Sequence, residues 1–200
     1  MRRRIVRLGG ALAGALAAAA MVAACGTLGS READRYFVLQ PGPPSGAPSP
    51  AAIAVVVAAT SVASFYDTQD IVYSRAPGAR AYYQFSHWTE RPHHAVHAQL
   101  VARFGAGASQ RGPILATQVV EIYHDAIQQP GTARIEIAAQ LVDPVSRAVI
   151  AQRAFIATAP ATSYDAAGAV AGISRALGAV LDDIVAWTAA QMPGVARPGS

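Results

Sequence analysis

The sequence predicts an α+β domain in which an antiparallel sheet carries two packed helices, the longer one C-terminal. Apolar, β-branched stretches separated by turn residues fill much of the chain, which indicates strands. Two segments, 92–104 and 163–191, instead repeat their apolar residues at helical spacing. Strands and helices that do not alternate regularly are typical of the α+β class.

Turn residues set the limits of the predicted strands. In chain order, the expected strands span residues 36–39, 53–57, 71–73, 81–85, 116–122, 133–142 and 148–157. The proline-rich segment 41–50 interrupts both helix and strand and is predicted to be a loop. Pro77-Gly78 predicts a hairpin between the third and fourth strands. Gln129-Pro130-Gly131 and Asp143-Pro144 separate the last three strands, so we expect them to form an antiparallel meander.

Apolar spacing and end signals define the two helices. In the first, Pro92 suits the opening turn, and Val96, Leu100 and Phe104 recur at every fourth position. In the second, Ser163 is the expected N-cap, and Met192-Pro193-Gly194 ends the helix. Its apolar stripe consists of Val170, Ile173, Leu177, Val180, Leu181, Ile184 and Trp187.

Small residues also recur along the second helix, at Gly168, Gly172 and Ala176. This spacing allows close helix contacts, either between helices in a membrane or against a sheet. Because Arg175, Asp182 and Asp183 interrupt any membrane-spanning stretch, we favour close packing on the sheet.

The positive charge of the chain is concentrated at its N-terminus. The 200 residues include 16 Arg and no Lys, and the formal net charge is +4. Arg2, Arg3, Arg4 and Arg7 account for this excess, since the other Arg residues equal the Asp and Glu residues in number. The lack of Lys excludes a P-loop lysine and Schiff-base catalysis, and the neutral body disfavours nucleic-acid binding.

Residues 1–24 are predicted to be an export signal. A basic segment precedes the apolar run 8–24, which is at the lower length limit for a membrane span, so a permanent transmembrane anchor is the disfavoured alternative. The run ends in Val22-Ala23-Ala24-Cys25, which resembles the bacterial lipobox. That resemblance implies cleavage between Ala24 and Cys25 and acylation of Cys25, which anchors the protein to a membrane. Since Cys25 is the only cysteine, an internal disulfide is excluded.

The remainder divides into three predicted segments. Residues 25–35 are the lipidated cysteine and a spacer, 36–191 are the folded domain, and 192–200 are a disordered tail. The spacer residues 26–34 extend to roughly 30 Å at most, which keeps the domain close to its membrane.

A histidine cluster suggests a metal site, which the rest of the sequence disfavours. His93 and His97 have the i,i+4 spacing of zinc ligands, and His94 lies between them. The HExxH glutamate is missing, and a further ligand would have to come from His87 or His124. The sequence also lacks a G-x-S-x-G nucleophile motif. We therefore expect neither an enzyme nor a metal or cofactor site.

Several motifs of the body occur in a recognisable order. Asp67-Thr68-Gln69-Asp70-Ile71-Val72-Tyr73-Ser74-Arg75 leads to Tyr83, and then to Trp88-Thr89-Glu90-Arg91-Pro92. The early strand 36–39, the hairpin from Gln140 to Phe155 and the final helix near Trp187 agree with the same pattern. In this order the mature chain resembles the ABC-type transport auxiliary lipoproteins.

The resemblance implies a function in transport. Lipoproteins of this family accompany an ATPase, a permease and an MCE-domain protein, and such systems move phospholipids or other hydrophobic molecules across a Gram-negative envelope. The chain would then be an accessory component that faces the periplasm. Gly26 after the lipidated cysteine favours the outer membrane over the inner one.

The same motifs supply the candidate contact residues for the transporter partners. They are Ile71, Val72, Arg75, Tyr83, Trp88 and Glu90. For Ile71, Tyr83 and Trp88, packing in the core is an equally weighted alternative. Two other functions also remain open, a structural lipoprotein of another envelope complex and a periplasmic lipid-binding carrier. Homo-oligomerisation is left open too.

Overall fold

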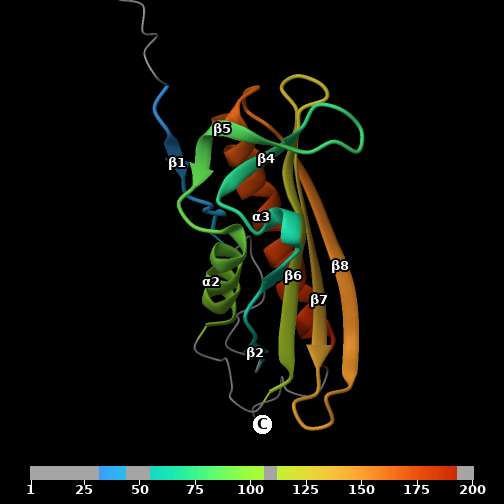
Figure 1. Cartoon of the computed structure of the whole chain (residues 1–200). Helices are drawn as coiled ribbons and strands as arrows, with labels where there is room; N and C mark the ends of the chain where they lie inside the picture. Colours follow the sequence, from blue (N-terminus) through green and yellow to red (C-terminus); the bar gives the residue numbers. More distant parts are fainter. Residues whose placement is uncertain (1–31, 44–54, 106–111, 193–200) are drawn as a thin grey trace, which may run out of the picture. The chain divides into compact units, whose positions relative to one another are not determined.

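The chain folds into one mixed sheet with two helices in the computed structural model, which describes residues 32–43, 55–105 and 112–192 (Figure 1). Contacts group Asp34 and all later described residues into one unit. The predicted α+β class and the long C-terminal helix are confirmed. The signal segment and Cys25 lie outside the described residues.

Three long strands form an antiparallel meander, as predicted. They are β6 (Ile114–Asp125), β7 (Thr132–Val142) and β8 (Val149–Pro160). Ile122 pairs with Ile135, and Ile137 pairs with Phe155, so one face of the meander is continuously apolar. Gly131 has a φ of 92° in the first turn, a conformation that glycine adopts without strain.

The shorter strands make the sheet mixed, whereas the sequence predicted an antiparallel sheet. The strand order is β1-β5-β4-β6-β7-β8, with β2 and β3 also paired to β6. The pairs β1–β5, β2–β6, β3–β6 and β4–β6 are parallel. The predicted hairpin is present, because β4 (Asp70–Ser74) and β5 (Ala81–Trp88) are antiparallel. After β5, the helix α2 (Pro92–Phe104) leads to β6, which runs in the same direction as β4.

The first two strands are shorter than predicted, and a third was not predicted. β1 covers Arg35–Phe37 and β2 covers Val56–Val57. The additional strand β3 covers Ser61–Val62. Residues 53 and 54 of the expected strand 53–57 lie outside the described residues. The 3-10 turn η2 (Ser64–Tyr66) connects β3 to the segment before β4.

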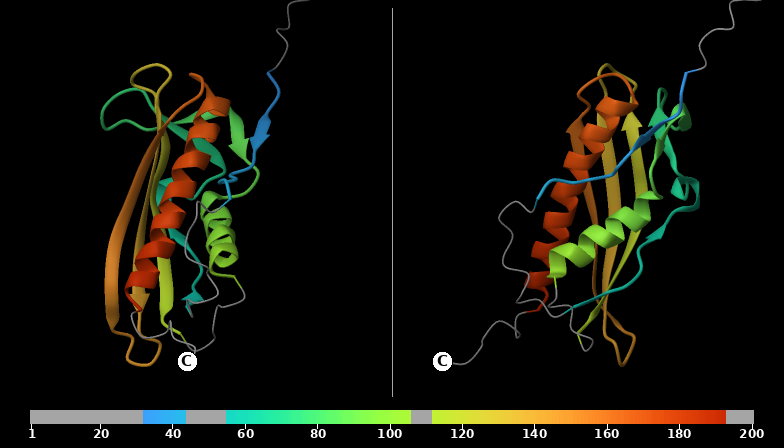
Figure 2. Two further views of the ribbon diagram at one scale, coloured as in Figure 1. Left: turned by 180° about the vertical axis from the view of Figure 1, so that it is seen from behind. Right: turned by 90° about the vertical axis from the view of Figure 1, so that its left-hand side faces the viewer.

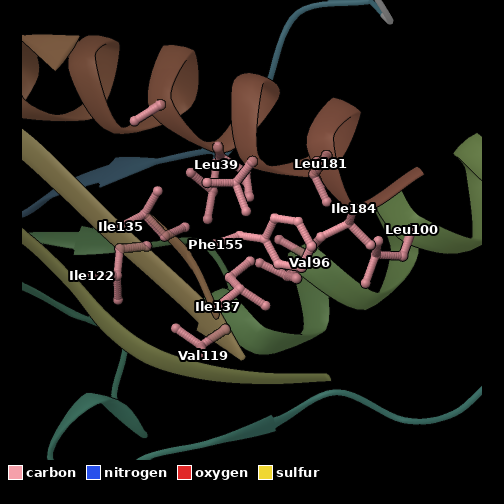
Figure 3. Close-up of a cluster of buried hydrophobic side chains, with 14 of the residues drawn as sticks. Leu39, Val96, Leu100, Val119, Ile122, Ile135, Ile137, Phe155, Leu181 and Ile184 are labelled. Atoms are coloured by element: carbon pink, nitrogen blue, oxygen red, sulfur yellow. The ribbon is translucent and has the colours of Figure 1, made fainter. Parts of the chain in front are cut away.

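The helix α3 (Ala166–Ala190) covers β7 and β8, and both helices lie on the same side of the sheet (Figure 2). Its predicted apolar stripe is confirmed for Ile173, Leu177, Val180, Leu181 and Ile184, which are fully buried. In the core, Leu181 and Ile184 face the sheet residues Ile135, Ile137 and Phe155 (Figure 3).

Gly172 brings α3 close to β7. A Cβ atom at position 172 would lie 2.8 Å from the Cβ of Ala133, closer than real Cβ contacts allow. The predicted packing of the small residues on the sheet is therefore confirmed at this position. Among the described residues, no helix is long and apolar enough to span a membrane.

The N-cap of α3 differs from the prediction. Asp165, and not Ser163, accepts the hydrogen bond from the backbone N–H of Gly168, at 2.8 Å. The hydroxyl of Ser163 donates to the same carboxylate oxygen of Asp165. A carboxylate is the stronger acceptor for an unpaired backbone N–H at a helix start, so the helix begins two residues later than expected.

Candidate functional site

The motif residues come together in a polar groove beside the first strand. It has a volume of about 330 Å³ and lies where β1, the start of β4, the end of β5 and the residue before α2 meet. Its lining consists of Tyr36, Asp67, Thr68, Gln69, Asp70, His87 and Arg91. We call this set the motif groove.

An Asp–His pair lies at the centre of the motif groove. Asp70 and His87 are opposite each other in the β4–β5 register, and Nδ1 of His87 lies 2.9 Å from Oδ1 of Asp70. Because a carboxylate accepts hydrogen bonds, Nδ1–H of His87 donates in this pair. The hydroxyl of Thr68 donates to the other oxygen, Oδ2 of Asp70, at 2.9 Å. Both oxygens of this carboxylate are therefore held in place.

The first strand closes one side of the groove. Tyr36 pairs with His87 in the parallel β1–β5 ladder, and their ring centroids are 5.5 Å apart. Oδ1 of Asp34 lies 3.8 Å from Nε2 of His87. The imidazole thus lies between two carboxylates, one from the segment that enters the domain and one from β4.

Gln69 joins the two motif segments through the backbone. Its side-chain amide donates to the carbonyl oxygens of Trp88 and Thr89, at 3.3 and 3.1 Å. The N–H of Trp88 donates to the carbonyl oxygen of Gln69, at 2.6 Å. These bonds hold the start of β4 against the end of β5, next to the register shift between Asp70 and Val72.

The other side of the groove carries Asp67, which lies beside Arg91 and His93. Oδ1 of Asp67 lies 3.3 Å from the guanidinium of Arg91 and 3.9 Å from Nδ1 of His93. Burial, followed by the neighbouring His94, lowers the pKa of His93 and so favours its neutral form. The groove presents carboxylates, an imidazole and a guanidinium, which suits it to the recognition of polar or charged groups.

The histidines of the predicted helix start do not form a metal site in the described part of the chain. No group of three or more His, Cys, Asp and Glu residues there is arranged to hold a metal ion. The rings of His93 and His94 meet edge to face, with centroids 4.2 Å apart. His87 and His124, the other candidate ligands, belong to separate hydrogen-bonded pairs.

Three of the six predicted contact residues lie in the core. Ile71, Val72 and Trp88 are 0%, 3% and 2% exposed. Their positions favour the alternative interpretation of core packing for Ile71 and Trp88, and they correct the assignment of all three as surface contacts. The physical reason is that Ile71 and Val72 of β4 and Trp88 at the end of β5 pack into the hydrophobic core cluster.

The other three candidates remain accessible, but the structure does not bring them together. Glu90 is exposed beside Arg91 of the motif groove, whereas Arg75 is exposed after the opposite end of β4. Tyr83 is half-buried on β5, where its hydroxyl lies 2.7 Å from Nδ1 of His124. Sequence reasoning therefore identified the motif segments, but not which of their side chains are accessible.

The pair of Tyr83 and His124 was not foreseen from the sequence. Nε2 of the fully buried His124 lies 3.0 Å from the carbonyl oxygen of Pro130 and must donate to it. In the neutral imidazole, Nδ1 then accepts from the hydroxyl of Tyr83. Burial lowers the pKa of His124 and raises the pKa of Tyr83 to about 12. The two residues are 41 positions apart, and no local pattern links them.

Comparison with solved structures identifies the fold. A crystal structure of a Xanthomonas campestris protein of family-model DUF330 has 23% identity, covers 80% of this chain and 97% of its own, and gives a TM-score of 0.72. An uncharacterized protein has 13% identity, covers 80% and 99%, and gives 0.60. The PelC dodecamer from Paraburkholderia phytofirmans has 16% identity, covers 76% and 95%, and gives 0.39. The first two similarities show that the chain shares their fold.

The family assignment comes from the sequence model. No curated protein matches the chain. Residues 37–185 match the family model described as the ABC-type transport auxiliary lipoprotein component. This range includes every residue of the motif groove except Tyr36 and spans β4, β5 and both helices up to Val185. The chain belongs to the family of ABC-type transport auxiliary lipoprotein components.

Proposed function

We propose that this protein is a lipid-anchored, periplasm-facing accessory component of an MCE-type ABC transporter that moves phospholipids or other hydrophobic molecules across a Gram-negative envelope. The motif groove carries this proposal. Its two motif segments lie 17 positions or more apart in the sequence, from Gln69 and Asp70 to His87 and Arg91, and yet form one surface. Membership in a family of transport auxiliary lipoproteins supports the link to a transporter.

The proposed anchor is acylated Cys25 in the outer membrane. Asp34, which precedes β1, contacts the groove through His87. Since residues 26–34 extend to roughly 30 Å at most, the groove would lie close to that membrane. The transporter proteins of the same system, namely the MCE-domain protein, the permease and the ATPase, are the proposed partners, with the MCE protein as the direct contact.

The proposed contact surface consists of the exposed groove residues and Glu90, because Ile71, Val72 and Trp88 are buried. Side chains at the centre of a binding surface contribute most when they are held in place before binding. The hydrogen bonds of Asp70 with His87 and Thr68 meet that condition.

The close contact between α3 and the sheet disfavours a lipid carrier. A carrier needs an apolar cavity for an acyl chain. Gly172 and Ala133 are so close that a methyl group does not fit between them. The side chains between α3 and the sheet, including Leu177 and Ile135, are fully buried in one core cluster. A role as a docking component agrees better with this packing.

Co-purification of the full chain tests the proposal. The protein carries a C-terminal tag and is expressed in its native host at the chromosomal level. We expect recovery of an MCE-domain protein and a permease, and increased envelope permeability when the gene is deleted. Recovery of neither partner, together with wild-type permeability on deletion, would contradict the proposal. Mass spectrometry of the N-terminal peptide tests the acylation of Cys25 separately.

A further inference from the structure

Aromatic and apolar side chains meet an exposed arginine at one end of the domain. Tyr164, just before α3, donates a hydrogen bond from its hydroxyl to the carbonyl oxygen of Ala126, at 2.8 Å. Ile127, which follows Ala126 in the β6–β7 turn, is 47% exposed, and Tyr164 is 37% exposed. We call Arg75, Ile127 and Tyr164 the end patch.

Arg75 is held over aromatic rings. Its guanidinium lies 4.8 Å from the ring centroid of Tyr73 and 5.8 Å from that of Tyr164. Among the described residues, it forms no ion pair with a carboxylate. An exposed guanidinium that is positioned by rings and not neutralised can bind a phosphate group in a fixed orientation.

The carboxylates near the end patch accept hydrogen bonds from backbone N–H groups. Oδ1 of Asp165 accepts hydrogen bonds from the N–H of Gly168 and from the hydroxyl of Ser163, and the bond from Gly168 is the main cause of the lowered pKa of Asp165. Oδ1 of Asp125 accepts from the N–H of Ile127. Among the residues that the structure describes, neither carboxylate forms an ion pair with Arg75.

The end patch lies at the end of the domain where the chain enters. In Figures 1 and 2, β1, the β6–β7 turn and the start of α3 lie at one end, and the β7–β8 turn lies at the other. The helix α3 runs between these ends and is about 37 Å long. The proposed lipid anchor at Cys25 is joined to Asp34 by a spacer of roughly 30 Å at most. The end patch is therefore at the end of the domain to which the spacer attaches.

We propose that the end patch rests on the phospholipid bilayer to which the protein is anchored. Arg75 binds a lipid phosphate, Tyr164 lies at the headgroup level, and Ile127 enters the boundary between headgroups and acyl chains. Tyrosine and arginine are enriched at this depth because each has an apolar body and a polar tip. The contact fixes the orientation of the domain, so that the β7–β8 turn points away from the membrane. The inference rests on the proposed lipid anchor.

The opposite end is the natural comparison. Val145 in the β7–β8 turn is 90% exposed, and Arg147 is exposed beside it. This end is at least as apolar as the end patch, so exposure of an apolar side chain alone does not select between them. The attachment point of the spacer and the ring-held Arg75 select the end patch.

Lipid quenching of a fluorescent label tests the proposal. Since acylation consumes Cys25, an added cysteine is the one free thiol. The lipidated full chain with Ile127→Cys, labelled with an environment-sensitive dye, is reconstituted into vesicles of phosphatidylethanolamine and phosphatidylglycerol that contain spin-labelled lipid. Val145→Cys is the matched control, and Gln128→Cys replaces Ile127→Cys if the latter does not fold.

We expect at least about twofold stronger quenching at position 127 than at position 145, since an interfacial group lies about 5–10 Å deep. Arg75→Gln should lower the quenching at 127 to the level at 145, while Arg147→Gln should leave it unchanged. Equal quenching at both positions, with Cys25 shown to be acylated by mass spectrometry, overturns the end patch but not the proposed function. A chain with unacylated Cys25 overturns both.

Discussion

The hydroxyl of Tyr83 lies 2.7 Å from Nδ1 of His124, whose imidazole is fully buried. The contact connects β5 to β6, which do not pair with each other directly. The ring of Tyr83 also packs on Tyr73, with centroids 4.8 Å apart. Since burial lowers the pKa of His124, we expect the stability of the domain to depend on pH.

The first prediction concerns acid. Because burial lowers the pKa of His124 in the folded state, the unfolded chain binds more protons at this residue. The contribution of the neutral His124 to the free energy of unfolding is complete above the pKa of the unfolded chain, about 6.5. It is lost as the pH falls from there through the pKa of the folded state. Urea unfolding of the wild type should show decreasing stability below that pH. His124→Gln should show a smaller decrease; an identical pH profile would contradict the assignment.

Tyr83→Phe tests the same contact at neutral pH. The substitution keeps the ring but leaves Nδ1 of the buried His124 without its donor. We expect a loss of about 1–3 kcal/mol in the free energy of unfolding. Tyr82→Phe is the matched control, since Tyr82 is exposed and its hydroxyl makes only a long contact of 3.4 Å. A loss equal to that of the control would show that the hydrogen bond does not stabilise the fold.

Two glycines of α3 should respond in opposite directions. At Gly172 an added methyl group meets Ala133 and the carbonyl oxygen of Pro160, so Gly172→Ala should destabilise the protein by about 1–3 kcal/mol. At Gly178 the nearest atom, the Cβ of Pro41, is 3.8 Å away, so Gly178→Ala should be neutral or stabilising by up to about 1 kcal/mol. Thermal unfolding of both variants gives the comparison. If both substitutions changed the stability by the same amount and in the same direction, the close contact at Gly172 would be contradicted.

A buried ion pair joins the two helices. The guanidinium of Arg103 lies 3.5 Å from Oδ1 of Asp182, and it also donates to the carbonyl oxygen of Gly42, at 3.4 Å. Because the side chain of Arg103 is only 4% exposed, Arg103→Ala should cost about 3 kcal/mol through lost charge pairing and lost packing. Asp183→Asn, on the exposed side of α3, should stay within about 0.5 kcal/mol of the wild type. Chemical unfolding measures both variants. Equal free energies of unfolding would contradict a stabilising role for the ion pair.

The sequence predicted the elements of the fold better than their pairing. Apolar spacing located α2, α3 and the meander, because helix and strand periods are local properties of the chain. Strand pairing depends on contacts between distant residues, so the parallel partners of β1 and β4 were missed. The cap at Asp165 was missed because Ser163 and Asp165 are both suitable acceptors, and only the geometry selects one.

The candidate site was predicted only in part. The motif segments were identified by resemblance, and both contribute to the motif groove. The apolar motif residues Ile71, Val72 and Trp88 were taken as contacts, although they are buried in the hydrophobic core. Asp34 and Tyr36 reach His87 through the parallel β1–β5 pairing, which no local pattern indicates. Accessibility is a tertiary property and was therefore the weakest part of the prediction.

The most direct test of the account is the amount of MCE-domain protein that co-purifies with a groove variant. Asp70→Asn keeps the size of the side chain but removes the charge beside His87, and Asp183→Asn makes the same change on the exposed side of α3. With both variants folded, as shown by circular dichroism, Asp70→Asn should lower the recovery roughly tenfold, and Asp183→Asn should leave it at the wild-type level. Wild-type recovery with Asp70→Asn, or an equal loss with both variants, would contradict the claim that the motif groove binds the transporter.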